Sequence, residues 1–94
     1  MTRRAARKDE NHNQIAAALE AAGAIVFDTS RVGGGFVDMI AVLPSGQTWL
    51  IEVKQPEGRF TVPEVQFAVR LTRPEYRVFT SPKQAAEAMR NGIK

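Results

Sequence analysis

The chain has 94 residues, of which 44% are hydrophobic, and a formal net charge of +3 at pH 7; this is the size and composition of one folded domain with a modest core. It contains no cysteine, so disulfides, zinc–thiolate sites and thiol catalysis are excluded and a cytoplasmic setting is expected. No apolar stretch approaches the roughly 18 residues of a membrane span, and the N-terminus lacks the apolar stretch of a signal peptide, so we expect no membrane partner.

Basic residues crowd the first eight positions, which form a basic N-terminal arm. Its cationic side chains are Arg3, Arg4, Arg7 and Lys8. Clusters of this kind often contact the phosphates of a nucleic acid. The alternative is a solvated, frayed terminus, and the sequence leaves both interpretations open.

Seven elements in the order α-β-β-β-α-β-α are predicted from hydrophobic periodicity and from turn residues. The helices cover residues 9–22, a segment from Thr61 that stops before Pro74, and a segment that opens at Ser81-Pro82; the strands cover 24–28, 36–43, 49–54 and 76–80. This order implies a central, mixed sheet of about four strands flanked by helices. The aromatic residues expected in the core are Phe27, Trp49, Phe67 and Phe79.

A glycine-rich stretch, Gly33-Gly34-Gly35, leads into the second strand. Because no helix N-terminus follows it, the stretch gives little support for a phosphate cradle. We expect the glycines to let the backbone turn, or to let a substrate approach closely.

A tight turn, Pro44-Ser45-Gly46, separates the second and third strands and predicts a β-hairpin. A three-residue loop pairs Leu43 with Gln47, so the residue numbers of each pair across the hairpin sum to 90. In this register Asp38 stands directly opposite Glu52. Directly opposed residues share a face of the sheet, with Cβ atoms about 5 Å apart. Lys54 points to the same face, since side chains alternate along a strand. A slip of one residue in this register would separate the two carboxylates.

Two carboxylates and a lysine in apolar strands indicate a site, because burying such charges is costly unless they are paired or hold a metal. Oxygen ligands suit Mg²⁺ or Mn²⁺, which also contact phosphate. Such a cation would acidify a bound water and polarise a phosphoryl oxygen. Lys54 could orient that water or offset charge on the phosphate. The alternative is a cross-strand salt bridge on a solvated sheet face.

Nearly the whole chain resembles the PD-(D/E)XK nuclease superfamily, and most of all its small members, the VRR-NUC domains and the archaeal- and phage-type Holliday-junction resolvases. The resemblance rests on an ordered set: a leading helix ending in Gly23, the motif Gly35-Phe36-Val37-Asp38, the motif Trp49-Leu50-Ile51-Glu52-Val53-Lys54, and a helix that starts at Thr61. It implies one nuclease domain over residues 1–94 with an α/β, restriction-endonuclease-like fold and Mg²⁺-dependent cleavage of DNA. It also implies that Asp38 and Glu52 are metal ligands, that the Val53 carbonyl assists them and that Lys54 is catalytic.

The chain departs from that family at three positions. Val37 replaces the usual proline before the aspartate, which shapes the backbone and performs no chemistry. The acidic residue usual on the leading helix corresponds to His12, which shares a helical face with Ile15 and Leu19. His12 could be a ligand, a base or a phosphate contact, or a plain surface residue.

The third departure concerns the helix after the third strand, where VRR-NUC domains carry an early glutamine. Here the matching offset falls on Glu64, and a glutamine follows at Gln66. Support of the metal site or of its water is one role open to either residue. Alternatively, Glu64 only completes the capping box that begins at Thr61, and Gln66 is an exposed helical residue.

The function expected from these observations is a structure-selective or weakly sequence-dependent DNA endonuclease of phage recombination or repair. A homodimer would enlarge the small core and let two sites cut two strands. Shape and phosphate contacts are expected more than base reading, with Arg31 added to the basic arm as a phosphate contact. Two alternatives remain: a DNA-binding or assembly module with a weakened nuclease site, and a plain α/β interaction domain whose charges are surface pairs.

Overall fold

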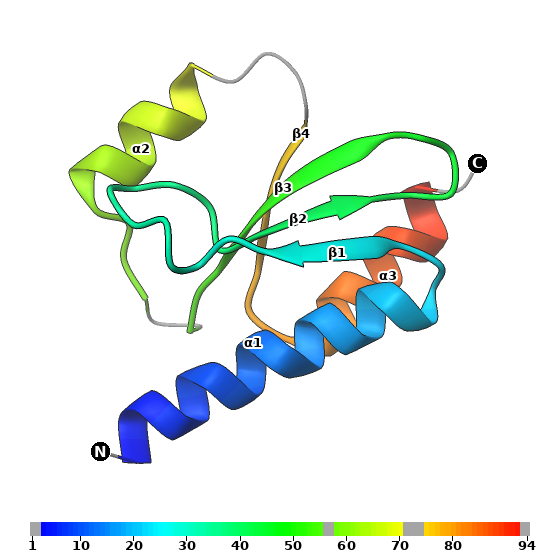
Figure 1. The fold of residues 1–94 in the computed structure, drawn as a ribbon, viewed down its shortest axis with the longest axis horizontal. Helices are drawn as coiled ribbons and strands as arrows, with labels where there is room; N and C mark the ends of the chain where they lie inside the picture. The colour runs from blue at the N-terminus through cyan, green and yellow to red at the C-terminus, as the bar shows by residue number, and fades with distance from the viewer. Residues whose placement is uncertain (1–2, 56–57, 71–74, 93–94) are drawn as a thin grey trace.

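The computed structural model describes residues 3–55, 58–70 and 75–92, and the side chains of residues 10–55, 58–70 and 75–91. Its helices are α1 (Arg3–Ala21), α2 (Val62–Val69) and α3 (Pro82–Gly92), and its strands are β1 (Ile25–Asp28), β2 (Met39–Val42), β3 (Thr48–Val53) and β4 (Glu75–Phe79). The predicted order α-β-β-β-α-β-α is confirmed (Figure 1).

The four strands form one sheet in the order β1-β2-β3-β4. β1 and β3 each pair antiparallel with β2, whereas β3 and β4 run parallel, so the expected mixed sheet is confirmed. The parallel pair needs a crossover rather than a tight turn, and α2 lies in that crossover. In the hairpin the N–H of Leu43 donates to the carbonyl of Gln47 at 2.8 Å, and Ile40 pairs with Leu50. The three-residue turn therefore has the predicted register.

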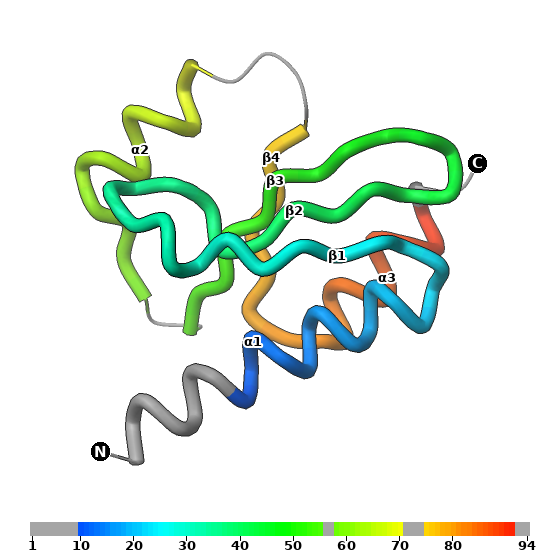
Figure 2. The backbone as a smooth tube through the Cα atoms, viewed as in Figure 1, coloured from blue at the N-terminus to red at the C-terminus, as the bar shows by residue number. Residues whose placement is uncertain are grey.

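Helices α1 and α3 lie side by side on one face of the sheet (Figures 1 and 2). Each helix buries an apolar pair four residues apart, which places both side chains on the same helical face. The pairs are Ile15 with Leu19 and Ala85 with Met89, all completely buried. Alternate residues of the central strands meet them, because side chains of a strand alternate between faces. These sheet residues are Met39, Ala41, Trp49, Ile51 and Val53.

Helix α2 is built from a local signal and is anchored to a loop. Its N-cap residue Thr61 accepts the Glu64 N–H, and the Glu64 side chain accepts the Thr61 N–H, so the predicted capping box is confirmed. No residue of α2 is buried. The helix contacts the loop between β1 and β2, where the Phe36 and Phe67 rings meet edge to face with centroids 5.3 Å apart.

Gly35 permits this contact between the loop and α2. A Cβ atom on Gly35 would lie 2.6 Å from the Cβ of Pro63, and its φ of +90° is one that L side chains rarely adopt. The glycine-rich loop therefore turns tightly and approaches the first turn of α2. The close neighbour of Gly35 is the backbone and ring of Pro63; close approach of a substrate to the glycine-rich stretch stays a prediction.

Several expectations are wrong in detail. α1 begins at Arg3 instead of Asp9, so the backbone of the basic arm continues the helix. β2 begins at Met39 instead of Phe36. Phe27 is 55% exposed because it pairs with Ile40 and points to the face that α1 and α3 do not cover.

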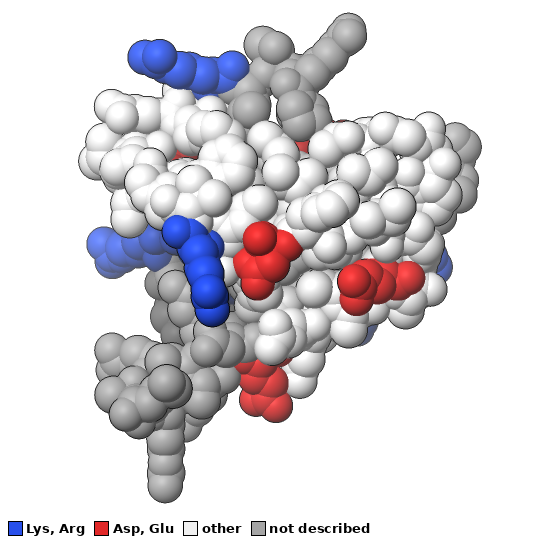
Figure 3. Space-filling model, in the orientation of Figure 1, with Lys and Arg blue, Asp and Glu red and all other residues white. Residues whose placement is uncertain are grey.

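Trp49 and Phe79 are core residues as predicted, whereas Phe67 is half-buried against Phe36 outside the main core. The predicted end of the second helix near Leu71 and Pro74 lies outside the described residues. Within the described part of the chain, no helix combines the length and the apolar content needed to span a membrane. On the face shown in Figure 3, Lys and Arg side chains lie around α2 and the β1–β2 loop, and none lies over the β2–β3 hairpin.

Candidate active site

Asp38 lies where the ladder between β2 and β3 is interrupted. Its N–H donates to the carbonyl of Ile51 at 2.9 Å, although Ile51 is already the pairing partner of Met39. Two residues of one strand thus face one residue of the other, which is the arrangement of a β-bulge. The prediction that Asp38 stands directly opposite Glu52 is wrong for this reason.

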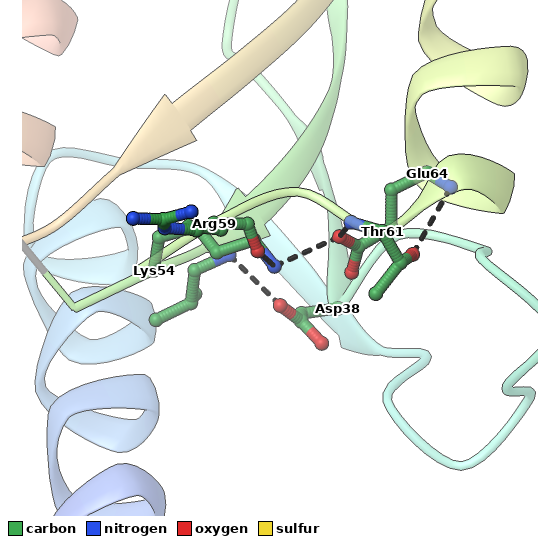
Figure 4. A network of polar contacts seen from close by, with 6 residues as sticks. Asp38, Lys54, Arg59, Thr61 and Glu64 are labelled. Atoms are coloured by element: carbon green, nitrogen blue, oxygen red, sulfur yellow. Dashed lines mark hydrogen bonds and ion pairs between the residues drawn. The ribbon is translucent and has the colours of Figure 1, made fainter. Parts of the chain in front are cut away.

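The interruption turns the carboxylate of Asp38 onto β3. Its Oδ2 accepts the N–H of Val53 at 2.8 Å (Figure 4). A continued ladder would have paired this N–H with the carbonyl of Val37. That carbonyl instead accepts the Thr29 hydroxyl at 2.8 Å. The Asp38 carboxylate therefore lies beside the residues that follow Ile51, and it remains a neighbour of the Glu52 side chain despite the lost register.

Among the described residues, Glu52 is the charged residue that is buried, with 3% of its surface exposed. Its Oε1 atom has no hydrogen-bond partner among those residues. Burial raises the pKa of Glu52, and the neighbouring Asp38 and Glu64 raise it further, to about 9. Two close carboxylates cannot both stay ionised without positive charge between them. In the absence of a cation, Glu52 therefore holds a proton at neutral pH.

Lys54 follows Glu52 by two residues and is held by a network of polar contacts (Figure 4). Its Nζ lies 2.8 Å from Oε1 of Glu64 and donates to the Arg59 carbonyl at 3.1 Å. The ammonium also lies 5.1 Å from the centre of the Phe60 ring. Because the Lys54 and Glu64 side chains are only 16% and 14% exposed, their ion pair is shielded from water more than a surface pair is. These contacts hold the Lys54 side chain in one position.

Glu64 connects this lysine to the start of α2. The same Oε1 atom that contacts Lys54 also accepts the Thr61 N–H at 2.8 Å. Burial acts to raise the pKa of Glu64, but the hydrogen bonds from Lys54 and from Thr61 outweigh it, and the pKa ends below its ordinary value. The capping role of Glu64 is confirmed, and the same oxygen also contacts Lys54; support of a metal site by Glu64 stays a prediction.

An open pocket of about 430 Å³ adjoins Asp38. Its lining comes from α1, from β1 and the loop after it, from Asp38 at the bulge, and from the end of β3. The lining residues are His12, Asn13, Asp28, Ser30, Arg31, Asp38 and Val53. His12 thus shares a pocket with Asp38, as its place on α1 suggested. Its Nε2 lies 3.5 Å from Oδ2 of Asp28, which is ion-pair distance when the imidazole is charged.

Asp28 is a pocket residue that sequence reasoning missed. Its Oδ1 accepts both the hydroxyl of Ser30 at 2.6 Å and the N–H of Ser30 at 2.9 Å. The hydroxyl and then the N–H of Ser30 lower the pKa of Asp28 below its ordinary value. An Asp two residues before a Ser at a strand end is a local turn signal. Only the position of β1 beside α1 places this carboxylate next to His12.

Two of the remaining predicted residues, Arg31 and Gln66, have described side chains, and both are exposed. Arg31 is exposed and lines the pocket. Gln66 is exposed on α2. The side chains predicted to form the basic arm lie outside the described side chains, and their phosphate contacts stay a prediction; they are Arg3, Arg4, Arg7 and Lys8.

The donor set at the bulge fits a hard cation. Asp38 and Glu52 supply carboxylate oxygens, and Oε1 of Glu52 is buried without a hydrogen-bond partner among the described residues. Among the described side chains, no three of His, Asp or Glu come close enough together to hold a metal ion. Water would therefore complete the coordination, as it commonly does for Mg²⁺.

Comparison with known proteins supports the fold and not a close relationship. No family model matches the chain, and no curated protein sequence matches it. Among solved structures, one described as a VRR_NUC domain has a similar fold, with a TM-score of 0.76 at 22% sequence identity. The similarity covers 88% of this chain and 94% of that chain. The expected α/β, restriction-endonuclease-like fold is thereby confirmed.

Proposed function

We propose that this chain is a Mg²⁺- or Mn²⁺-dependent DNA endonuclease, acting as a homodimer on branched DNA in the manner of a Holliday-junction resolvase. The observation that carries the proposal is the meeting of Asp38 and Glu52 at a bulge, with Lys54 two residues beyond, on a fold similar to that of a VRR_NUC domain. We also propose a cytoplasmic role in phage recombination or repair.

Asp38, Glu52 and the carbonyl of Val53 are the residues assigned to the cation. When bound, the cation supplies an activated water and polarises the phosphoryl oxygen. It also replaces the proton that Glu52 carries in its absence, since both carboxylates can ionise beside a positive charge. The chain's own contribution is the bulge, which brings an aspartate carboxylate to the strand that carries the glutamate.

Lys54 is assigned to the phosphate. Its charge stabilises the negative charge that develops on the phosphoryl oxygens in the transition state. Glu64 is assigned to positioning Lys54. For Gln66, which is exposed on α2, support of the metal site or its water stays a prediction. Because Lys54 is already oriented by Glu64 and by the Arg59 carbonyl, little reorganisation is needed when the substrate arrives.

DNA contacts are assigned to Arg31 and to the basic arm. Arg31 lines the pocket beside Asp38, and the basic arm of α1 supplies Arg3, Arg4, Arg7 and Lys8. These side chains would contact the phosphates of the DNA backbone. Phosphate contacts give affinity and fix the position of the protein, but they carry little sequence information. Selection of branched DNA by shape agrees with the small surface of a 94-residue chain.

Cleavage assays on a four-way junction and on linear duplex DNA test the proposal. We expect cleavage with Mg²⁺ or Mn²⁺ and none with EDTA. Lys54→Ala should lower the cleavage rate by about 100-fold or more, with folding checked by the fluorescence of buried Trp49. The exposed Lys83→Ala on α3 is the matched control. Cleavage that persists in EDTA or in Lys54→Ala would contradict the proposal. Sedimentation of the free protein tests the homodimer.

A second candidate is a DNA-binding or assembly module on the same fold. It is favoured by the lack of three converging His, Asp or Glu side chains in the described part of the chain. This candidate predicts binding of branched DNA without cleavage in either metal, and unchanged binding in Asp38→Asn. Fluorescence anisotropy with labelled junctions, run beside the cleavage assay, distinguishes the two.

A further inference from the structure

The pocket beside Asp38 contains a histidine–carboxylate pair that the roles assigned so far do not use. His12 comes from α1 and Asp28 from the last position of β1, and Nε2 of the imidazole lies 3.5 Å from Oδ2 of the carboxylate. Only 14% of the His12 side chain is exposed, whereas 63% of the Asp28 side chain is. The imidazole is therefore mostly enclosed, and the carboxylate is its charged neighbour within ion-pair distance.

Ser30 fixes Asp28 for this contact. Its hydroxyl and its N–H both donate to Oδ1 of Asp28, at 2.6 and 2.9 Å. With Oδ1 engaged, Oδ2 is the oxygen turned to His12. A pair 3.5 Å apart is longer than a good hydrogen bond, but catalytic hydrogen bonds are often long before substrate binds. When Nε2 carries a proton and donates it to Asp28, Nδ1 is the nitrogen left for whatever enters the pocket.

Hydrolysis of a phosphodiester requires a group that accepts a proton from the attacking water. Lys54 is an unsuitable acceptor, because its ammonium is paired with Glu64 and donates to the Arg59 carbonyl. The carboxylates at the bulge are committed to the cation in the proposed function. The other charged groups lining the pocket with His12 are Asp28, Arg31 and Asp38. Of the pocket groups, a neutral imidazole is the base best suited to work near neutral pH.

Resting on the proposed function, we propose that Asp28 is a positioning residue that holds His12 so that Nδ1 accepts the proton of the attacking water. The water oxygen bonds to phosphorus while the bond from phosphorus to the leaving sugar oxygen breaks. One proton of the water passes to Nδ1 of His12, and the leaving oxygen takes a proton from solvent.

Nuclear magnetic resonance tests the contact without any cleavage. His12 is the one histidine of the sequence, so its ring signals need no assignment against others. At low temperature we expect a ring Nε2–H signal, protected from exchange by Asp28, in the wild-type protein. Asp28→Ala should lose this signal to solvent exchange, and Ser30→Ala should weaken it. The control Glu10→Gln removes an exposed carboxylate of α1 and should leave the signal unchanged.

Kinetics on the DNA substrate test the role. His12→Gln should lower kcat by about 100-fold while changing KM little, as for loss of a general base. Asp28→Asn should lower kcat by about 10-fold in the wild-type background, because the base is misplaced. In the His12→Gln background, Asp28→Asn should lower kcat by less than about twofold, because the effects of two residues that act through one another are not additive.

The outcomes separate this inference from the proposed function. Cleavage that depends on Lys54 but survives His12→Gln would overturn the inference and leave the nuclease intact. Additive effects of Asp28→Asn and His12→Gln, or a ring signal unchanged in Asp28→Ala, would likewise overturn the role of Asp28. A wild-type protein that cleaves no DNA overturns both. A melting curve of each variant shows that the losses do not come from unfolding.

Discussion

Glu52→Gln is the substitution whose effect the structure predicts most directly. Glutamine has nearly the shape of a protonated glutamic acid, and it cannot ionise. The wild-type side chain is buried, and its pKa is raised from 4.5 to about 9 by burial and by Asp38. We therefore expect the metal-free wild-type protein and the variant to behave alike below pH 4.5, and to diverge as the pH rises above it.

The sign follows from counting protons. Between pH 4.5 and about 9, Glu52 is protonated in the folded chain and ionised in the unfolded chain. The folded state thus binds one more proton, so raising the pH favours unfolding. One bound proton corresponds to about 1.4 kcal/mol for each pH unit. From pH 6 to pH 8, the wild-type protein should lose about 2.7 kcal/mol of unfolding free energy relative to Glu52→Gln.

Denaturation by guanidinium chloride in EDTA measures this difference, with the fluorescence of Trp49 as the signal. Trp49 is the single tryptophan and is completely buried, so its emission reports unfolding of the core. Glu87→Gln on α3, which removes an exposed carboxylate, is the control and should follow the wild-type pH dependence. Parallel curves for wild type and Glu52→Gln between pH 6 and pH 8 would refute the reasoning, because Glu52 would then be ionised in the folded protein.

Three further predictions concern the metal, the core and the loop. Mg²⁺ should stabilise the wild-type protein more at pH 8 than at pH 6, because binding displaces a proton; calorimetry should show this binding lost in Asp38→Asn. Leu19→Ala should cost about 3 kcal/mol of unfolding free energy, whereas the exposed neighbour Glu20→Ala should cost little. Gly35→Ala should lower the free energy of unfolding by about 1–3 kcal/mol. The loss should exceed that of Gly33→Ala, because of the two glycines only Gly35 would place a Cβ against α2. Equal losses of unfolding free energy for the two variants, measured by denaturant titration, would contradict the contact between the loop and α2.

Local signals account for the parts of this protein that were predicted correctly. The turn at Pro44-Ser45-Gly46 determines the hairpin register, since loop length decides which residues pair. The capping box at Thr61 and Glu64 uses atoms only three residues apart, so it can form wherever the rest of the chain lies. Apolar residues four apart in α1, and alternating ones in β3, determine which faces are buried.

The site needed contacts between distant parts of the chain. A regular alternation of side chains along the strand does not predict the bulge at Asp38. There the Val37 carbonyl, which a continued ladder would use, accepts the Thr29 hydroxyl. Asp28 becomes a site residue because β1 lies beside α1, and not because of its own neighbours in sequence.

Phe27 shows the same division between sequence and tertiary structure. Its apolar strand predicted a buried ring, yet α1 and α3 both cover the other face of the sheet and leave it 55% exposed. The sequence by itself therefore determined the elements, the hairpin register and the residues able to carry charge. Tertiary structure alone decided which of those residues meet, because side-chain contacts depend on how strands and helices pack, and periodicity along one segment carries no information about its neighbours.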